Sequence, residues 1–121
     1  MKGRPNPVRD RDDLTVTTVT QPLDQVGGVR LRNAIRKSVS EGKIDHALDL
    51  NGLARIDSLT LAAMIHALRA VREAGGSVSL LVQQPQILKI LSITGLDRIF
   101  PIHNNELEAR AFLVGAQRIS A

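Results

Sequence analysis

The sequence predicts one α/β domain, with about four α-helices packed against a small mixed β-sheet of about four strands. Short β-branched or apolar runs alternate along the chain with longer segments of helical periodicity, an order typical of strands joined by crossover helices. A length of 121 residues, 43% of them hydrophobic and 23% charged, suits one domain with one core. We place a flexible leader at residues 1–12, where Pro5 and Pro7 stand among charges, and the domain at residues 13–121.

The first strand is predicted at residues 14–20, which are rich in β-branched side chains. Leu14 and Val16 fall on one face of such a strand and Val19 on the other, so either a bulge or burial of both faces is needed. Residues 22–24 then break the strand. The segment is too compressed to require a second short strand before the next helix.

A helix is predicted from about residue 25 to residue 41, because apolar residues recur there at helical spacing. Gly27 and Gly28 weaken its beginning, so the reliable part starts near Val29. Gly42 is well placed to end it. The apolar residues at helical spacing are Leu31, Ala34, Ile35 and Val39.

The centre of the chain predicts a strand, a crossover helix and another strand, at residues 46–50, 59–74 and 77–82. That order implies a parallel strand pair with a right-handed connection. Met64 falls off the expected core stripe of the helix, either at a core edge or in an exposed patch that binds a partner. The stripe itself consists of Leu61, Ile65, Leu68 and Val71.

The last third predicts a short helix, an edge strand and a final helix. Pro85 suits the first turn of the short helix and Gly95 its end. The proline within residues 99–102 argues that this strand lies at an edge of the sheet. Asn104 or Asn105 is expected to cap the final helix. The apolar face of that helix is expected to be Leu107, Ala111 and Val114.

Chemistry is expected at the polar turn between the strand at residues 46–50 and the helix at residues 59–74. Ser58 follows Asp57 where the helical pattern begins, so its hydroxyl lies at or next to the N-cap, where it satisfies free backbone N–H groups. The same position exposes the hydroxyl at the positive end of a helix dipole, where an added phosphate is tolerated. Spacing alone favours the capping role.

Five stretches between residues 44 and 112 carry a family resemblance. They are Leu48-Asp49-Leu50, Asp57-Ser58, Glu73-Ala74-Gly75-Gly76, Ser79-Leu80-Leu81-Val82 and Leu91-Ser92-Ile93-Thr94-Gly95-Leu96-Asp97-Arg98-Ile99-Phe100-Pro101-Ile102. In order and spacing they resemble the STAS domain, the family of sulfate transporters and anti-sigma-factor antagonists. Members typically carry Asp-Ser-Ser-Gly or Asp-Ser-Thr-Gly at the turn, and a partner kinase phosphorylates the serine after the aspartate. By that match the phosphoacceptor is Ser58, while Leu59 and Thr60 depart from the usual hydroxyl residue and glycine.

The resemblance implies a STAS-like fold and an interaction module of the anti-sigma-factor antagonist type. Such a protein binds an anti-sigma factor with serine kinase activity, and phosphorylation, here at Ser58, breaks the complex. A phosphatase is a further implied partner. The contact surface is expected to include Asp57, Ser58, Leu59 and Thr60, with Met64 near them, and Thr60 is a second candidate phosphoacceptor.

Two other functions stay open at this point. The substituted turn also fits a STAS scaffold that is not switched, such as a subunit of an ABC-type lipid transporter or of a signalling complex. The net charge of +4 raises nucleic-acid binding, which would weaken steeply with salt. That charge is scattered, and Phe100 and Phe112 are the only aromatic residues, so a stacking platform is missing and we expect no nucleic-acid partner.

The chain offers little for catalysis, for a metal or for a cofactor. It has no cysteine, and His46, His66 and His103 lack metal-ligand spacing and are expected at the surface or at edges. Asp49 and Asp57 are expected in structural roles rather than as an acid and base pair, Asp57 as a helix-start residue that fixes the turn and Asp49 near the end of a strand. Without a catalytic constellation, we expect no enzymatic activity. No run approaches the ~20 apolar residues of a membrane span and the N-terminus lacks the apolar block of a signal peptide, so we expect a cytoplasmic protein.

Overall fold

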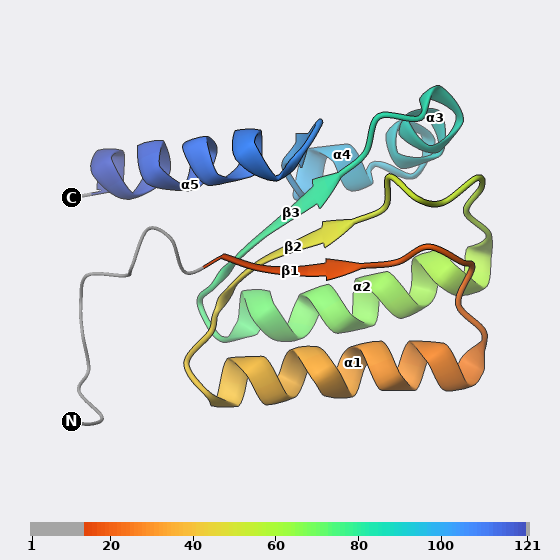
Figure 1. Cartoon of the computed structure of the whole chain (residues 1–121), viewed down its shortest axis with the longest axis horizontal. Helices are drawn as coiled ribbons and strands as arrows, with labels where there is room; N and C mark the ends of the chain where they lie inside the picture. The colour runs from red at the N-terminus through yellow and green to blue at the C-terminus, as the bar shows by residue number, and fades with distance from the viewer. Residues whose placement is uncertain (1–13, 121) are drawn as a thin grey trace.

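The computed structural model describes residues 14–120, apart from the side chains of residues 114 and 116–120 (Figure 1). The predicted leader at residues 1–12 lies outside the described residues. In chain order the elements are β1 (Leu14–Thr18), α1 (Gln25–Ser40), β2 (Asp45–Asp49), α2 (Ser58–Glu73), β3 (Ser77–Leu81), α3 (Pro85–Thr94), α4 (Leu96–Ile99), β4 (Ile102–His103) and α5 (Glu106–Ser120).

The four described strands form one sheet in the order β1-β2-β3-β4, and every neighbouring pair is parallel. The register sets Leu14 opposite Asp45, and Asp45 opposite Ser77. The α/β class is as the sequence predicts, but the sheet is parallel rather than mixed, because a helical crossover joins each strand to the next. β4 is a two-residue edge strand next to a proline, as expected.

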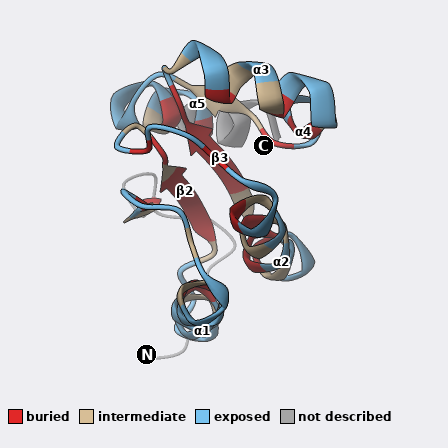
Figure 2. Ribbon diagram, turned by 90° about the vertical axis from the view of Figure 1, so that its right-hand side faces the viewer, coloured by how far each residue is buried: buried red, intermediate tan, exposed pale blue. Residues whose placement is uncertain are grey.

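Helices cover both faces of the sheet, and each face has its own core (Figure 2). The larger core joins one face of the strands to α1, α2, α3 and α4, and the smaller core joins the other face to α5. Val19 belongs to the larger core and Leu14 to the smaller one, so burial of both faces explains the change of face in the first strand. β2 is divided in the same way, with Leu48 in the larger core and Ala47 in the smaller.

α1 begins at Gln25, as predicted, so the helix includes its two glycines. Asp24 caps the helix, and its Oδ1 accepts a hydrogen bond from the Gly27 N–H at 2.7 Å, which offsets the weak helix propensity of glycine. Gly28 has a packing role, since a Cβ placed on it would lie 2.9 Å from the Ala63 Cβ of α2. Of the expected apolar face, Leu31 and Ile35 are buried, Val39 is partly buried and Ala34 is exposed.

The buried stripe of α2 is rotated from the expected one. Leu61 and Ile65 are only partly buried, whereas Met64 is 1% exposed and lies in the larger core. The expectation that Met64 contributes to a partner-binding surface is therefore wrong. Thr60, one turn before it, is fully buried, and residues four apart share a helix face, so Met64 points inward with it. The buried residues of α2 are Thr60, Met64, Ala67, Leu68 and Val71.

The C-terminal third contains one helix that the sequence did not predict. α3 begins at Pro85 and ends at Thr94, and Gly95 caps it with a φ of 79°, the left-handed conformation that glycine adopts without strain. α4 then turns the chain toward β4, with Leu96 and the following Phe100 buried in the larger core. The described residues thus hold five helices rather than four.

α5 packs against the sheet with a different face from the expected one. Asn105 caps the helix, since its Oδ1 accepts a hydrogen bond from the Glu108 N–H at 3.0 Å. Ala109 and Leu113 are buried in the smaller core, whereas Leu107 is 76% exposed. The prediction of a packed face through Leu107 is wrong, because α5 turns Ala109 and Leu113 toward the sheet residues Leu14, Ala47 and Leu81. Ala111 is exposed as well, and the Val114 side chain lies outside the described residues.

Candidate functional site

Two connections that follow the C-terminal ends of neighbouring strands place the predicted turn next to the beginning of α1. β1 and β2 are parallel, so residues 19–24 and 50–57 leave the sheet at the same edge before entering α1 and α2 (Figure 1). These connections are close, because a Cβ on Gly52 would lie 3.0 Å from the Thr20 Cγ2. The positive ends of two helix dipoles therefore lie on the same side of the molecule as the turn.

Thr60 links the two connections. Its hydroxyl accepts a hydrogen bond from the Leu23 N–H at 2.8 Å and is also hydrogen-bonded to the Asp57 carboxylate. Asp57 is the N-cap of α2, and its Oδ1 accepts a hydrogen bond from the Thr60 N–H at 2.8 Å. The capping role thus belongs to Asp57, and Ser58 stands next to the cap.

The pKa of Asp57 is lowered below its ordinary value. The largest cause is the hydrogen bond with the Thr60 side chain, followed by that with the Thr60 backbone, and the positive charge of Arg55 adds to them. Because the folded-state pKa is below the unfolded-state pKa, this carboxylate stabilises the fold above the unfolded pKa. The contribution is lost as the pH falls through the folded pKa. At neutral pH the turn carries this negative charge.

Ser58 and Leu59 are the adjacent exposed residues at the start of α2. Ser58 is its first residue and is exposed, and Leu59 is 50% exposed. Thr60 differs, because it is 0% exposed and its hydroxyl is already hydrogen-bonded. The expectations that Thr60 contacts a partner and that it serves as a second phosphoacceptor are therefore wrong for the folded chain.

A groove of about 310 Å³ opens between the beginnings of α1 and α2. Its lining includes Val29 and Arg32 from α1, and Leu59 and His66 from α2. Val29 is 43% exposed, and Val26, about one turn before it on α1, is 59% exposed. Apolar side chains gathered on a surface in this way are typical of a protein-binding site. We call Val29, Asp57, Ser58 and Leu59 the turn surface.

Sequence reasoning missed two features of the site. The Gln84 side chain donates hydrogen bonds to the carbonyl oxygens of Leu50 at 2.8 Å and Leu53 at 2.6 Å, which ties the α2 connection to the start of α3. No local pattern signals these bonds, because they join residues 34 and 31 positions apart. The three-residue spacing of Val26 and Val29 could have indicated two neighbouring exposed apolar side chains on a helix. The glycines between them instead suggested that the helix is weak there.

Thr60→Val is expected to destabilise the fold and to raise the pKa of Asp57. The change leaves the Leu23 N–H without its acceptor, which costs about 1–2 kcal/mol of unfolding free energy. Stability should also vary less with pH in the acid range, because the Asp57 pKa moves toward its unfolded value. Urea unfolding at neutral and acidic pH and NMR titration of the Asp57 carboxyl measure the two effects. Thr60→Ser keeps the hydroxyl and should retain the lowered pKa; an unchanged pKa in Thr60→Val would contradict the assignment.

The three histidines do not form a site. His46 is 2% exposed within β2, and its Nε2 lies 2.7 Å from a backbone carbonyl oxygen, so the expected surface position is wrong for it. His66 is exposed on α2, and His103 lies on the edge strand β4. Asp49 stabilises the turn after β2, because its Oδ1 accepts a hydrogen bond from the Asn51 N–H at 2.9 Å. The side chains that the structure describes include no group of three or more His, Cys, Asp or Glu that could hold a metal ion.

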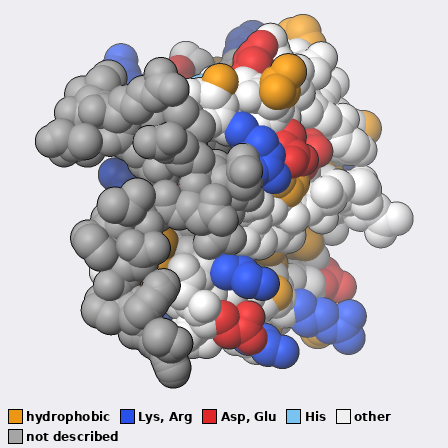
Figure 3. All heavy atoms as spheres, turned by 60° about the vertical axis from the view of Figure 1, so that its left-hand side comes forward, with side chains coloured by type: hydrophobic (Ala, Val, Ile, Leu, Met, Phe, Trp, Pro, Cys, Tyr) orange, Lys and Arg blue, Asp and Glu red, His pale blue; other side chains and the backbone are white. Residues whose placement is uncertain are grey.

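The charged side chains in the view of Figure 3 are of both signs. Lys and Arg lie beside Asp and Glu on this face, rather than forming one continuous positive field. The described side chains on this face therefore form no extended basic patch of the kind typical of nucleic-acid binding. Among residues 14–120, the structure has no helix with both the length and the apolar character needed to cross a membrane.

One family model matches most of the chain, that of the STAS domain, over residues 6–109. The anti-sigma F factor antagonist of Paenibacillus polymyxa is 23% identical over 97 residues, which cover 79% of this chain and 83% of that protein. A TM1081 homologue from Thermotoga neapolitana is 36% identical over 62 residues, or 51% of this chain. The chain spans about half of that relative, 55% of its length.

Solved structures with low sequence identity share the fold. The crystal structure of TM1081 from Thermotoga maritima has a TM-score of 0.75 at 23% identity, covering 84% of this chain and 88% of that chain. The anti-sigma factor antagonist SpoIIAA, solved in its unphosphorylated form, has a TM-score of 0.63 at 16% identity, with coverages of 84% and 89%. At these identities the likeness concerns the fold alone.

Proposed function

The chain belongs to the STAS domain family, and from this premise we propose that it is an anti-sigma-factor antagonist switched by phosphorylation of Ser58. The unphosphorylated chain binds an anti-sigma factor through the turn surface and so frees the sigma factor for transcription. The anti-sigma factor, acting as a serine kinase, phosphorylates Ser58 and dissociates, and a phosphatase restores binding. The chain itself acts in the cytoplasm by binding rather than by catalysis.

The observation that carries the proposal is the position of Ser58, exposed as the first residue of α2 and directly after the anionic cap Asp57. A phosphate there adds about −1.5 to −2 charges. The N-terminus of α2 stabilises added negative charge, so phosphorylation is expected to leave the fold intact. The effect then falls on the partner, which has to accept a cluster of negative charge at the contact.

The rest of the turn surface supplies binding energy and shape. Leu59 stands where the family usually has a hydroxyl residue, and covering its exposed half with a partner adds an apolar contact. The Thr60 hydrogen bonds tie the α1 side of the surface to the α2 side before any partner arrives. Such preorganisation lowers the entropy cost of binding.

One observation favours a second candidate function, an unswitched scaffold in an ABC-type lipid transporter or a signalling complex. Val29 and Leu59, which line one groove, are 43% and 50% exposed, and their contact area does not depend on the state of Ser58. A permanent partner that covers them would need no phosphorylation.

Intact-mass and peptide mass spectrometry of the protein from its own cells, with and without stress, tests the proposal. We expect a phosphate on Ser58 whose occupancy changes with condition, and a kinase-like anti-sigma factor that co-purifies with the unphosphorylated fraction. A Ser58→Ala chain from the same cells is the control and should carry no phosphate on this peptide. An unmodified Ser58 in every condition, together with a stable partner, would instead support the scaffold.

A further inference from the structure

We propose that two copies of this chain associate by seating Leu107 of one copy in a groove between α2 and α4 of the other. The proposal does not depend on the switch at Ser58. It rests on a match between two surfaces of the same chain, one with arginines around an apolar groove and one with glutamates around an exposed leucine.

The receiving surface is a groove of about 240 Å³. This is below the 300–1,000 Å³ typical of small-molecule sites, so it suits one inserted side chain. Ile99, on its rim, is 52% exposed, although it lies next to the buried Phe100. The apolar lining consists of Ile65, Leu96, Ile99 and Phe100.

Two guanidinium groups, those of Arg69 and Arg72, complete the groove. Arg72 is held in place, since its Nη1 donates to the Ile99 carbonyl oxygen at 2.9 Å and its guanidinium lies 5.6 Å from the centre of the Phe100 ring. Within the described part of the chain, neither guanidinium forms an ion pair. Arginine has five N–H donors in a planar fork, so each of these two side chains can donate further hydrogen bonds to a carboxylate of another molecule.

The inserting surface is the first turn of α5. Leu107, at 76%, is the most exposed large apolar side chain among the described residues, and it stands between Glu106 and Glu108. The two glutamates flank Leu107 in the helix, and each carboxylate has a fixed partner: Glu106 pairs with Arg110 at 2.8 Å, and Glu108 accepts the Asn104 N–H at 3.0 Å. A carboxylate has about four acceptor sites, so each of the two glutamates can also accept hydrogen bonds from an arginine of a second copy.

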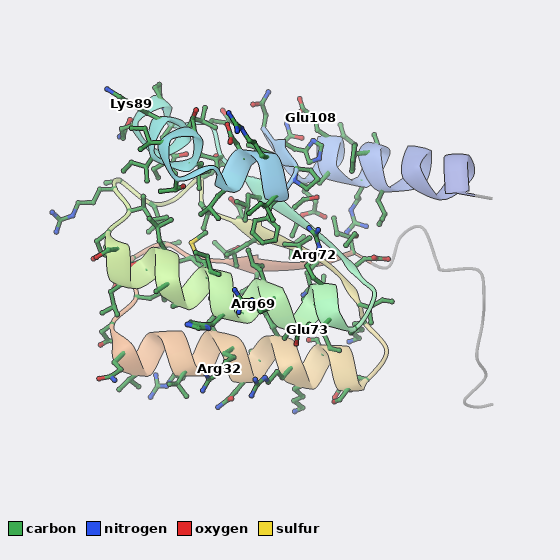
Figure 4. The ribbon with its side chains drawn as sticks, turned by 180° about the vertical axis from the view of Figure 1, so that it is seen from behind. Arg32, Arg69, Arg72, Glu73, Lys89 and Glu108 are labelled. Atoms are coloured by element: carbon green, nitrogen blue, oxygen red, sulfur yellow. The ribbon has the colours of Figure 1, made fainter. Side chains whose placement is uncertain are left out.

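The match of charge and polarity identifies the occupant as a second copy. The groove places two arginines around an apolar space, and the α5 turn places two glutamates, of which Glu106 is paired with Arg110, beside an apolar side chain; opposite charges matched in this way orient protein contacts. In Figure 4, Arg69 and Arg72 lie on α2, and Glu108 lies at the start of α5 beyond α4. A two-fold axis near α4 would make the contact reciprocal, so that each copy supplies one leucine and one groove.

Sedimentation equilibrium of the full chain over a range of concentrations tests the proposal. We expect a reversible dimer in the wild type, and a dissociation constant raised about tenfold or more by Leu107→Asp and by Arg69→Glu, both at exposed positions. Ile93→Asp, at a position 73% exposed on α3, is the matched control and should dimerise like the wild type.

Mixing the two defective variants adds a second test. The groove of the Leu107→Asp chain is intact and can receive Leu107 of the Arg69→Glu chain, so the mixture should associate more tightly than either variant alone. A wild type that stays monomeric at millimolar concentration would overturn the proposal. So would a Leu107→Asp chain that dimerises as tightly as the wild type, or a mixture no tighter than its components.

Discussion

Ser58→Asp is expected to weaken binding to the anti-sigma partner about 100-fold, a loss of about 2.7 kcal/mol, while Ser58→Ala binds like the unphosphorylated chain. The aspartate puts a second negative charge directly after Asp57, within the exposed turn surface. A partner that binds the unphosphorylated turn has to desolvate this charge or meet it with its own, and like charges across an interface cost several kcal/mol. Titration calorimetry with the purified partner measures the difference.

Ser58→Asn is the matched control for this prediction. Asparagine has nearly the shape of aspartate without its charge, so it should keep most of the affinity if charge is what breaks the complex. All three variants should unfold at nearly the wild-type temperature, because Ser58 is exposed and its hydroxyl is not the cap of α2. Equal affinities of Ser58→Ala and Ser58→Asp would rule out the switch and leave the fold untouched.

Gly76→Ala is expected to destabilise the fold by about 3 kcal/mol, at the upper end for overpacking. A Cβ on Gly76 would overlap the Ile44 carbonyl oxygen and lie 2.7 Å from the Ile44 carbonyl carbon, and backbone cannot swing away as a side chain can. The Gly76 N–H also donates to the Val71 carbonyl oxygen at 3.0 Å, at the end of α2. The added methyl must therefore push the beginnings of β2 and β3 apart.

Gly115→Ala is the matched control, because the same methyl group would meet nothing within 4 Å there. Glycine within a helix is about 1 kcal/mol less favourable than alanine, so this change should leave stability unchanged or raise it. Urea unfolding of both variants beside the wild type measures the two effects. A Gly76→Ala chain as stable as the wild type would show that the link between α2 and β3 can shift without cost.

The candidate site was predicted in part. Asp57 and Ser58 were placed at the start of a helix by the change from strand to helix pattern, and the structure puts them there. Thr60 was expected at the surface together with Asp57, Ser58 and Leu59, because it belongs to the same turn and carries no local sign of burial. Its hydrogen bond with Leu23 joins residues 37 positions apart, a distance at which local patterns carry no information.

The same limit explains Met64 and Leu107. Both stand in helices that the periodicity located correctly, yet Met64 lies in the core and Leu107 in solvent. α2 and α5 each carry apolar residues on more than one side, so periodicity permits several rotations of the helix about its axis. The choice among them depends on what the helix packs against.

Local patterns were thus sufficient for the α/β class, for the order of the long elements and for the exposed serine at the start of α2, because each depends on neighbouring residues. The inward face of each helix and the burial of Thr60 depend on contacts between segments far apart in the chain. Those contacts form when the two faces of one sheet are covered together, and no short stretch of sequence contains that information.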